Sequence, residues 1–188
     1  MNLVIFGPPG AGKGTQSKFI VEKFNMFQLS TGEFLRKEMS LNTSIGKKIS
    51  SVINAGNLVS DEIVSDLIEK IISKTIYRNR MIFDGYPRNL NQAKNLDDLL
   101  KKYKQKIDIV LKLSVSLETI KKRISESRSQ EKRPDDNENI AVKRYQTYEK
   151  STEPVIEYYK KLNLLKVVDG ERPIDQINNE ISDIISLI

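Results

Sequence analysis

The sequence contains no cysteine and no histidine. Without cysteine, disulfides and thiolate metal sites are excluded. Without histidine, an imidazole general base, a Ser-His-Asp triad and a His-ligated metal site are excluded as well. No apolar run approaches the roughly 20 residues that a membrane-spanning helix needs, so we expect no membrane partner. No signal peptide precedes the first apolar run, so we expect a cytoplasmic location.

Length and composition are typical of a globular protein with an excess of positive charge. The 188 residues suffice for one domain, and 38% apolar and 30% charged residues suit a soluble chain. The net charge of +6 favours anionic partners, among which nucleic acid has to be considered. The lysines are scattered, however, and no dense basic run with interleaved aromatic residues occurs. We therefore interpret most of this charge as a solvated surface and expect no nucleic-acid partner.

A glycine-rich stretch follows the first apolar run, residues 3–6. Residues 7–15 read Gly-Pro-Pro-Gly-Ala-Gly-Lys-Gly-Thr and meet the pattern Gly-x4-Gly-Lys of a phosphate-binding loop. In such a loop backbone N–H groups turn inward around an anion, the following helix adds its positive N-terminus, and Lys13 reaches the outer phosphates. Gly14 stands where serine or threonine would hold Mg2+, and Thr15 comes one place late, so phosphates and water are expected to hold most of the metal. The alternative is a glycine-rich turn without a ligand.

Short apolar runs alternate with helical patterns along the rest of the chain. This alternation predicts an α/β fold of the phosphate-loop NTPase type, with a parallel sheet covered by helices on both faces. Two small helices within residues 30–59 contain few large apolar residues, which predicts an inserted flap rather than a packed layer. The predicted strands span about residues 3–6, 27–29, 81–83, 107–115 and 164–168.

Three local patterns say more about individual helices. The buried face of the first helix, at about residues 15–24, is predicted to consist of Phe19, Ile20, Val21 and Phe24. Pro154 predicts a break or a kink in a long helix that ends near residue 162. One apolar face is predicted for the final helix, formed by Ile174, Ile177, Ile181, Ile184, Ile185 and Ile188.

A second candidate for the site follows the strand at 81–83. Residues 84–88 read Asp-Gly-Tyr-Pro-Arg, and ligands of open α/β sheets bind where the carboxyl ends of parallel strands meet. We therefore expect Asp84 to lie near the phosphate loop and to accept hydrogen bonds from water around Mg2+, the alternative being an ordinary helix cap. Arg88 lies on a turn stiffened by Pro87. Gln92, one helical turn further on, carries an amide that both donates and accepts.

Arginine is much rarer than lysine, 9 against 22 residues, and its distribution is uneven. Its planar guanidinium grips phosphate oxygens in pairs, which lysine cannot do. The number of arginines near expected ligand-binding edges exceeds what one triphosphate needs, which predicts two phosphate-bearing ligands facing each other; surface ion pairs are the alternative. The arginines in or beside predicted loops and helix ends are Arg36, Arg88, Arg123, Arg128, Arg133 and Arg144.

These motifs, in this order, resemble those of the adenylate kinase family, within the nucleoside monophosphate kinases. The resemblance spans nearly the whole chain, and a glycine after the lysine of the phosphate loop is normal in this family. The stretches that carry the resemblance are residues 7–15, 30–32, 56–62, 84–88, 92–93, 133–136, 144 and 168–170.

The resemblance implies a reaction, the reversible Mg2+-dependent conversion of ATP and AMP into two ADP. Nothing in the sequence requires more than a monomer. On the ATP side the resemblance implies contacts with Gly10, Ala11, Gly12, Lys13, Gly14, Thr15, Arg123, Arg128 and Arg172. On the AMP side it implies contacts with Thr31, Arg36, Asn57, Leu58, Val59, Gly85, Tyr86, Pro87, Arg88, Gln92, Arg133 and Arg144, with Gln92 reading the adenine edge. The implied catalytic residues are Lys13, Asp84, Arg88, Arg123, Arg133 and Arg144.

The resemblance also divides the chain. It implies a core of residues 1–29, 60–126 and 138–188, an AMP-binding insert at 30–59 and a short lid at 127–137. The short lid lacks the insert that carries zinc ligands in some relatives, so no zinc is expected. Relatives often have a second lid arginine where this chain has Ser127, and Arg128 is a candidate substitute. Pro134 stiffens a lid position that is more often flexible.

Three other functions fit parts of the pattern. A UMP/CMP kinase is the nearest, and the pairs Gln92-Ala93 and Leu58-Val59 argue against it. A non-catalytic nucleotide-binding module with a phosphate loop would need one site, not a second arginine-lined pocket. A basic nucleic-acid binder would show salt-sensitive affinity. The implied reaction needs no general base, because the AMP phosphate already carries the attacking anionic oxygen.

Overall fold

The computed structural model describes residues 1–40, 44–54, 59–126 and 138–188. Within these ranges five strands form one sheet in the order β2-β3-β1-β4-β5, and every neighbouring pair is parallel. The predicted α/β fold with a parallel sheet is therefore confirmed, and each predicted strand is present. The strands are β1 (Leu3–Phe6), β2 (Phe27–Ser30), β3 (Met81–Asp84), β4 (Ile109–Ser114) and β5 (Leu165–Asp169).

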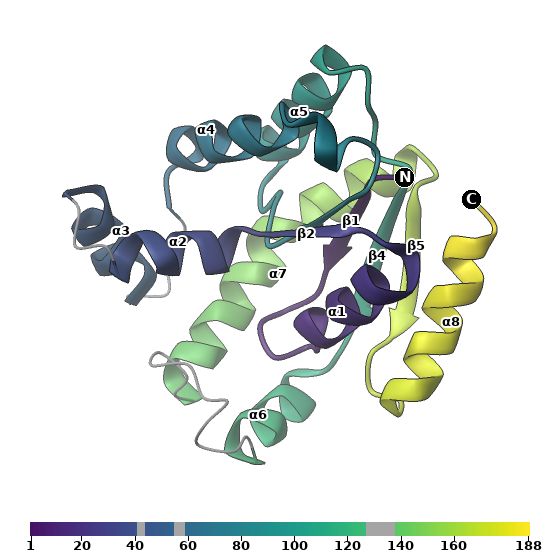
Figure 1. Ribbon diagram of the computed structural model, residues 1–188. Helices are drawn as coiled ribbons and strands as arrows, with labels where there is room; N and C mark the ends of the chain where they lie inside the picture. Colours follow the sequence, from purple (N-terminus) through teal and green to yellow (C-terminus); the bar gives the residue numbers. More distant parts are fainter. Residues whose placement is uncertain (41–43, 55–58, 127–137) are drawn as a thin grey trace.

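Helices cover both faces of the sheet (Figure 1). One face packs against α1 (Lys13–Phe24), α6 (Leu117–Glu126) and α8 (Ile174–Ser186). The other packs against α4 (Asp61–Ile72), α5 (Leu90–Lys102) and α7 (Glu138–Lys161). Two shorter helices, α2 (Thr31–Ser40) and α3 (Ser44–Asn54), follow β2, and the 3-10 helix η1 (Thr75–Tyr77) precedes β3.

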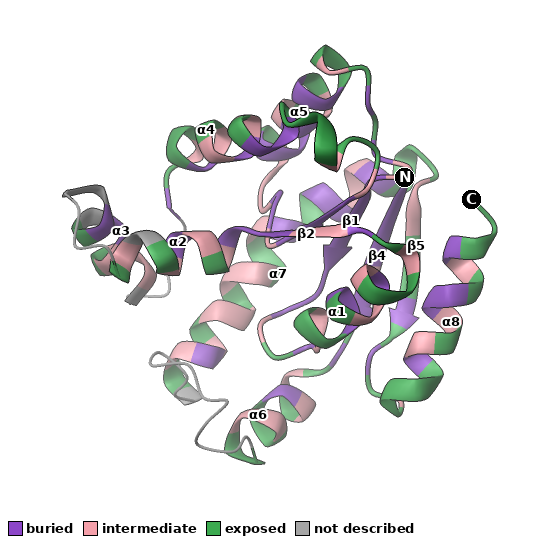
Figure 2. Ribbon diagram, in the orientation of Figure 1, coloured by how far each residue is buried: buried purple, intermediate pink, exposed green. Residues whose placement is uncertain are grey.

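The central strand β1 contributes to both apolar cores because its side chains alternate between the two faces. Val4 and Phe6 belong to the core under α4, α5 and α7, whereas Leu3 and Ile5 belong to the core under α1, α6 and α8. All four residues are buried, as Figure 2 shows for the middle of the sheet. Full burial of each such side chain stabilises the fold by about 1.5–3 kcal/mol, so the strand that carries the phosphate loop is firmly anchored.

The predicted apolar face of the first helix is confirmed in part, because Ile20 is buried and Phe19, Val21 and Phe24 pack against the same core. Gln16, Ser17 and Ile20 are the buried residues of α1, whereas Phe19 and Phe24 are only partly buried at the edge of the core. The helix starts at Lys13, directly after the phosphate loop, and its first turns lie against the sheet. The polar residues Gln16 and Ser17 in those turns are therefore buried, while Phe19 and Phe24 further along the helix are buried only in part.

Two expectations about the later helices are corrected. The helix α7 runs through Pro154 without ending, so of the predicted break or kink the break is wrong, and the kink stays a prediction. Pro154 and Lys150, whose carbonyl loses its helical partner, are both exposed, so water can satisfy that carbonyl. In α8, the predicted apolar face includes two residues that the structure leaves exposed. Ile174 starts the helix at 57% exposure, and Ile188 lies beyond the helix end at 61% exposure.

The two small helices predicted within residues 30–59 are present as α2 and α3. Each of them contributes an apolar residue to the core: Leu35 and Ile49 are buried within the same cluster as Val4. The expected functions of this insert and of the lid stay predictions. Six residues named above lie outside the described residues: Asn57, Leu58, Ser127, Arg128, Arg133 and Pro134. Within the described ranges, no helix combines the length and apolar character that crossing a membrane requires.

Candidate active site

The phosphate loop leaves β1 and ends at the first turn of α1. Gly10 and Gly12 have φ angles of +85° and +93°, which favour glycine. A Cβ on Gly10 would in addition lie 3.2 Å from Cγ2 of Ile120. Gly12 is the N-cap residue, and among the described residues no side chain caps the helix that begins at Lys13. The N-terminal N–H groups of α1 and the positive end of its dipole therefore point at an anion site.

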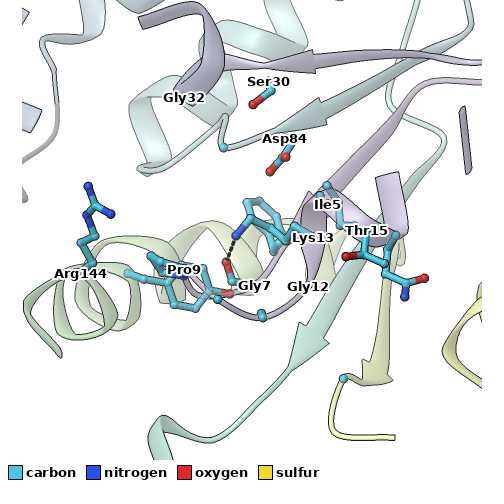
Figure 3. Close-up of a pocket in the computed structure, with 18 of the residues that line it drawn as sticks. Ile5, Gly7, Pro9, Gly12, Lys13, Thr15, Ser30, Gly32, Asp84 and Arg144 are labelled. Carbon is cyan, nitrogen blue, oxygen red and sulfur yellow. Dashed lines mark hydrogen bonds between the residues drawn. The ribbon is translucent and has the colours of Figure 1, made fainter. Parts of the chain in front are cut away.

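Lys13 folds back over the loop that precedes it. Its Nζ donates to the carbonyl of Gly7 at 2.7 Å and to that of Pro8 at 3.1 Å. Figure 3 shows the amine inside the loop, with Asp84 and Ser30 on the opposite wall. Both of these contacts are to neutral carbonyls.

Asp84 ends β3 beside the phosphate loop, as the sequence predicted. In the sheet register it lies opposite Ile5 on one side and Ser30 on the other. The carboxylate accepts from Nε2 of Gln28 through Oδ2 at 3.0 Å. Figure 3 shows that Asp84 and Lys13 point into the same space. A buried carboxylate near an ammonium group and a phosphate loop suits water ligands of Mg2+, because one oxygen remains for them.

In the turn after β3, two side chains donate to one carbonyl. Gly85 has a φ of +77°, and its carbonyl accepts from Oγ1 of Thr31 at 2.9 Å and from Nε of Arg88 at 2.7 Å. A Cβ on Gly85 would lie 2.9 Å from Thr31 Oγ1 and 3.1 Å from Nη2 of Arg88. The peptide bond between Tyr86 and Pro87 is cis. The hydrogen bond from Nε to the Gly85 carbonyl holds the Arg88 guanidinium against this turn.

Gln92 is held on both sides of its amide. Its Oε1 accepts from the backbone N–H of Arg88 at 2.7 Å, and its Nε2 donates to Oδ1 of Asp61 at 2.7 Å. Asn89 caps α5 by accepting from the backbone N–H of Gln92 at 2.9 Å, and its own amide donates to both oxygens of Asp61. Gln92 is buried and lines a small pocket together with Thr31, Arg36, Val59, Gly85 and Arg88.

Arg123 connects the phosphate loop with the segment after β5. Its guanidinium donates to the carbonyl of Gly170 at 2.7 Å and to that of Ala11 at 3.3 Å. Arg172, by contrast, forms ion pairs with Glu180 and, at 3.7 Å, with Asp169. Both arginines are partly exposed, which leaves room for a ligand beside them.

A single cleft of about 840 Å3 gathers most of the predicted residues. It runs along the carboxyl edge of the sheet, between the phosphate loop, the turn after β3, α2, α6 and α7. Its cations come from six separate parts of the chain: Lys13, Arg36, Arg88, Arg123, Arg144 and Arg172. Thr31, Val59 and Gln92 line the adjoining small pocket.

The structure does not bring Tyr86 into this cleft. The side chain is 1% exposed and belongs to the apolar core, where its hydroxyl accepts from Nδ2 of Asn95 at 3.3 Å. Burial raises the pKa of Tyr86, so the hydroxyl stays protonated. The backbone of Tyr86 belongs to the turn beside the cleft, whereas its ring packs in the apolar core.

One wall of the cleft consists of residues that no sequence motif indicated. On α7, Thr147, Tyr148, Ser151 and Thr152 line it together with Arg144. Their distances from Arg144 along the chain follow the three-to-four-residue repeat of a helix face, which could have identified them. Burial raises the pKa of Tyr148, and within the described part of the chain its hydroxyl has no hydrogen-bond partner. It is therefore a neutral donor beside the cations.

The fold and the cleft define a class of protein, the α/β enzymes that bind nucleotides through a phosphate loop. A family model described as adenylate kinase matches residues 5–164. The chain is 43% identical to the adenylate kinase of Pelagibacter ubique strain HTCC1062, with both chains covered completely. It is 40% identical to that of Caulobacter sp. strain K31, again with complete coverage. It is 42% identical to that of Prochlorococcus marinus strain MIT 9515 over 96% of each chain. The chain belongs to the adenylate kinase family and is therefore a phosphotransferase.

Proposed function

We propose that the chain converts ATP and AMP reversibly into two ADP, with Mg2+ bound to ATP, as a cytoplasmic monomer. The observation that supports this most directly is the convergence of Lys13 and five arginines on one cleft. One nucleotide with its phosphates would not need cations from so many separate segments. Two phosphate chains that meet end to end would need them, because repulsion between the phosphates has to be offset.

The two ends of the cleft differ in what they offer a nucleotide. We assign ATP to the end formed by residues 10–15 together with Arg123, Arg128 and Arg172, because the loop there provides backbone N–H groups for a phosphate chain. We assign AMP to the end formed by Thr31, Arg36, residues 57–59 and residues 85–88, with Gln92 at the base. Lys13, Arg88, Arg133 and Arg144 are assigned to the middle, where the phosphoryl group is transferred.

The proposed transfer requires charge compensation and positioning rather than a proton carrier. An oxygen of the AMP phosphate attacks the γ-phosphorus of ATP, the bond to the β-phosphate oxygen breaks, and both products leave as ADP. Lys13, Arg88 and Arg144 would hold positive charge around the three equatorial oxygens. Bound Mg2+ would neutralise the donor phosphates, and Asp84 would accept hydrogen bonds from its water ligands. Closure of the insert at 30–59 and the lid at 127–137 would keep out water, which could otherwise take the phosphoryl group.

A coupled assay with ATP and Mg2+ tests the activity across AMP, GMP, CMP and UMP. We expect ADP formation with AMP, little with the other three, and none once a chelator has removed Mg2+. Preferred use of UMP or CMP would support a UMP/CMP kinase instead. Saturable binding of ATP without ADP formation from any mixed pair would point to a nucleotide-binding module.

Replacement of Arg88 tests the middle of the cleft. An arginine that stabilises a phosphoryl group in transfer contributes about 10³–10⁵ in rate, so Arg88→Ala should lose nearly all turnover. The folded state should persist, because Arg88 is only half-buried and its Nε donates to a turn carbonyl rather than to a group of the core. Arg78→Ala is the matched control, since Arg78 is an exposed arginine after η1. Near-normal turnover of Arg88→Ala would remove this residue from the mechanism.

A further inference from the structure

The carboxylate of Asp61 lies beside the residue that is expected to read the base. Asp61 is the first residue of α4, whereas Gln92 lies in the first turn of α5. Their side chains meet with Nε2 of Gln92 2.7 Å from Oδ1 of Asp61. Asn89 donates to both oxygens of the same carboxylate, at 3.0 and 3.1 Å. Three polar side chains at the N-terminal ends of two helices thus form one network, and Gln92 is the member of it that lines the small pocket.

The network leaves only one orientation for the amide of Gln92. The backbone N–H of Arg88 is a donor, so only Oε1 can face it. The carboxylate of Asp61 is an acceptor, so only Nε2 can face it. A rotation of the amide by 180° would set two donors against each other on one side and two acceptors on the other. Such contacts at a buried site cost as much as lost hydrogen bonds, so the two neighbours hold the amide from both ends.

The fixed amide has one lone pair and one N–H left for a ligand in the pocket. Adenine fits this pair, because its 6-amino group donates and its ring N1 accepts. A 6-oxopurine offers the reverse pattern, since O6 accepts and N1–H donates. To bind a 6-oxopurine equally well, the amide of Gln92 would have to rotate, which its two neighbours oppose.

We propose that Asp61 is a positioning residue that fixes the Gln92 amide for adenine and thereby rejects 6-oxopurine nucleotides. The proposal rests on the proposed function, in which Gln92 reads the base of AMP. Asp61 does not touch the base. It acts through Gln92, and the Arg88 backbone N–H provides the second restraint on the same amide.

Asp61→Asn removes the restraint while keeping the shape of the side chain. An asparagine amide can present either its oxygen or its nitrogen to Gln92, so it tolerates both orientations. The experiment measures kcat and KM with ATP and Mg2+ for AMP and for IMP, which reverses the donor and acceptor on the reading edge. We expect the ratio of kcat/KM for AMP to that for IMP to fall about tenfold, mainly through a lower KM for IMP. The fall is partial because the Arg88 N–H still restrains the amide.

Two companion variants separate this role from a structural one. Glu62→Gln removes one negative charge from the same turn of α4 at an exposed position, and its AMP-to-IMP ratio should equal that of the wild type. Asp61→Glu keeps an acceptor-only carboxylate and should retain most of the discrimination. If a thermal unfolding experiment shows that Asp61→Asn is not folded, Asp61→Ser replaces it, since a hydroxyl also donates and accepts.

Each result decides between the proposals. Failure of the wild type to use AMP would overturn the proposed function itself. If the wild type uses AMP, but Asp61→Asn or Asp61→Ser leaves the ratio unchanged, the role of Asp61 is refuted, even when both rates fall together. Loss of folding in both variants would assign the carboxylate to stability alone and would also overturn the proposal. A lower ratio in Asp61→Asn, with Glu62→Gln unchanged, supports it.

Discussion

Replacement of Gly85 by alanine should damage stability and turnover at once, and the size of both effects follows from the turn after β3. A non-glycine residue at a φ of +77° costs roughly 1–2 kcal/mol. The new Cβ would also lie 2.9 Å from Thr31 Oγ1 and 3.1 Å from Arg88 Nη2, so both side chains have to move. Together these terms suggest a loss of about 2–3 kcal/mol. For a chain of this length that corresponds to a fall in Tm of about 5–10 °C.

The loss of turnover in Gly85→Ala should exceed what its stability change explains. A catalytic group misplaced by about 1 Å can cost about 10²-fold in rate, and the Arg88 guanidinium is pushed away by the new methyl group. Calorimetry would give Tm, and the coupled assay at 25 °C, where the variant is still folded, would give kcat. Gly14→Ala serves as the stability control, because an added Cβ would meet no described residue within 4 Å apart from its chain neighbours and its own helix backbone, and its φ is not positive. Wild-type Tm together with wild-type kcat in Gly85→Ala would refute the reasoning.

Two further predictions concern stability and the ATP end of the cleft. Burial raises the pKa of Asp97 above its ordinary value of 3.8. As the pH rises, the carboxyl group therefore loses its proton at a lower pH in the unfolded chain than in the folded chain. The bound proton favours the folded state at pH values below the ordinary carboxyl pKa, and this contribution is lost as the pH rises. An asparagine does not titrate, so Asp97→Asn should gain stability relative to the wild type from pH 4 to pH 7. Urea unfolding at each pH would measure the difference in free energy of unfolding, and a difference that stays constant would contradict the prediction. Arg123→Ala should raise the KM for ATP while leaving the KM for AMP unchanged. It should also lower the free energy of unfolding by about 1–3 kcal/mol, because the carbonyls of Ala11 and Gly170 lose a charged donor. Lys122→Ala, an exposed cation on the same helix, is its control, and an equal rise in both KM values would argue against a specific role at the ATP end.

The features that the sequence could predict are those set by local patterns or by general rules of α/β sheets. The strand β1, the glycine-rich loop and Lys13 lie within a few residues of one another, so their spacing alone predicted the geometry. The meeting of this loop with Asp84 followed from the rule that parallel strands end at one edge. The arginines were found by residue type, and the structure brings Arg36 and Arg144 to the same cleft.

The features that could not be predicted depend on contacts between distant segments. Asp61 and Gln92 lie 31 residues apart and meet only because α4 and α5 pack with their N-termini together. Gln16 is a polar residue outside the predicted apolar face of the first helix, yet it is 2% exposed. Tyr86 lies inside a binding motif, but the direction of its side chain depends on the turn, and that direction is toward the core. Propensity and periodicity carry no information on such orientations.

The position of β1 in the middle of the sheet has a consequence for synthesis on the ribosome. Leu3 pairs with Ile82 on one side and with Ile109 on the other, so β1 leaves the ribosome long before either neighbour. At about 5–20 residues per second, the nascent chain carries this apolar strand without its partners for on the order of ten seconds. During that time the apolar residues Val4 and Ile5 have no neighbouring strand with which to pair. The fold therefore closes around the first strand only after more than half of the chain has been made.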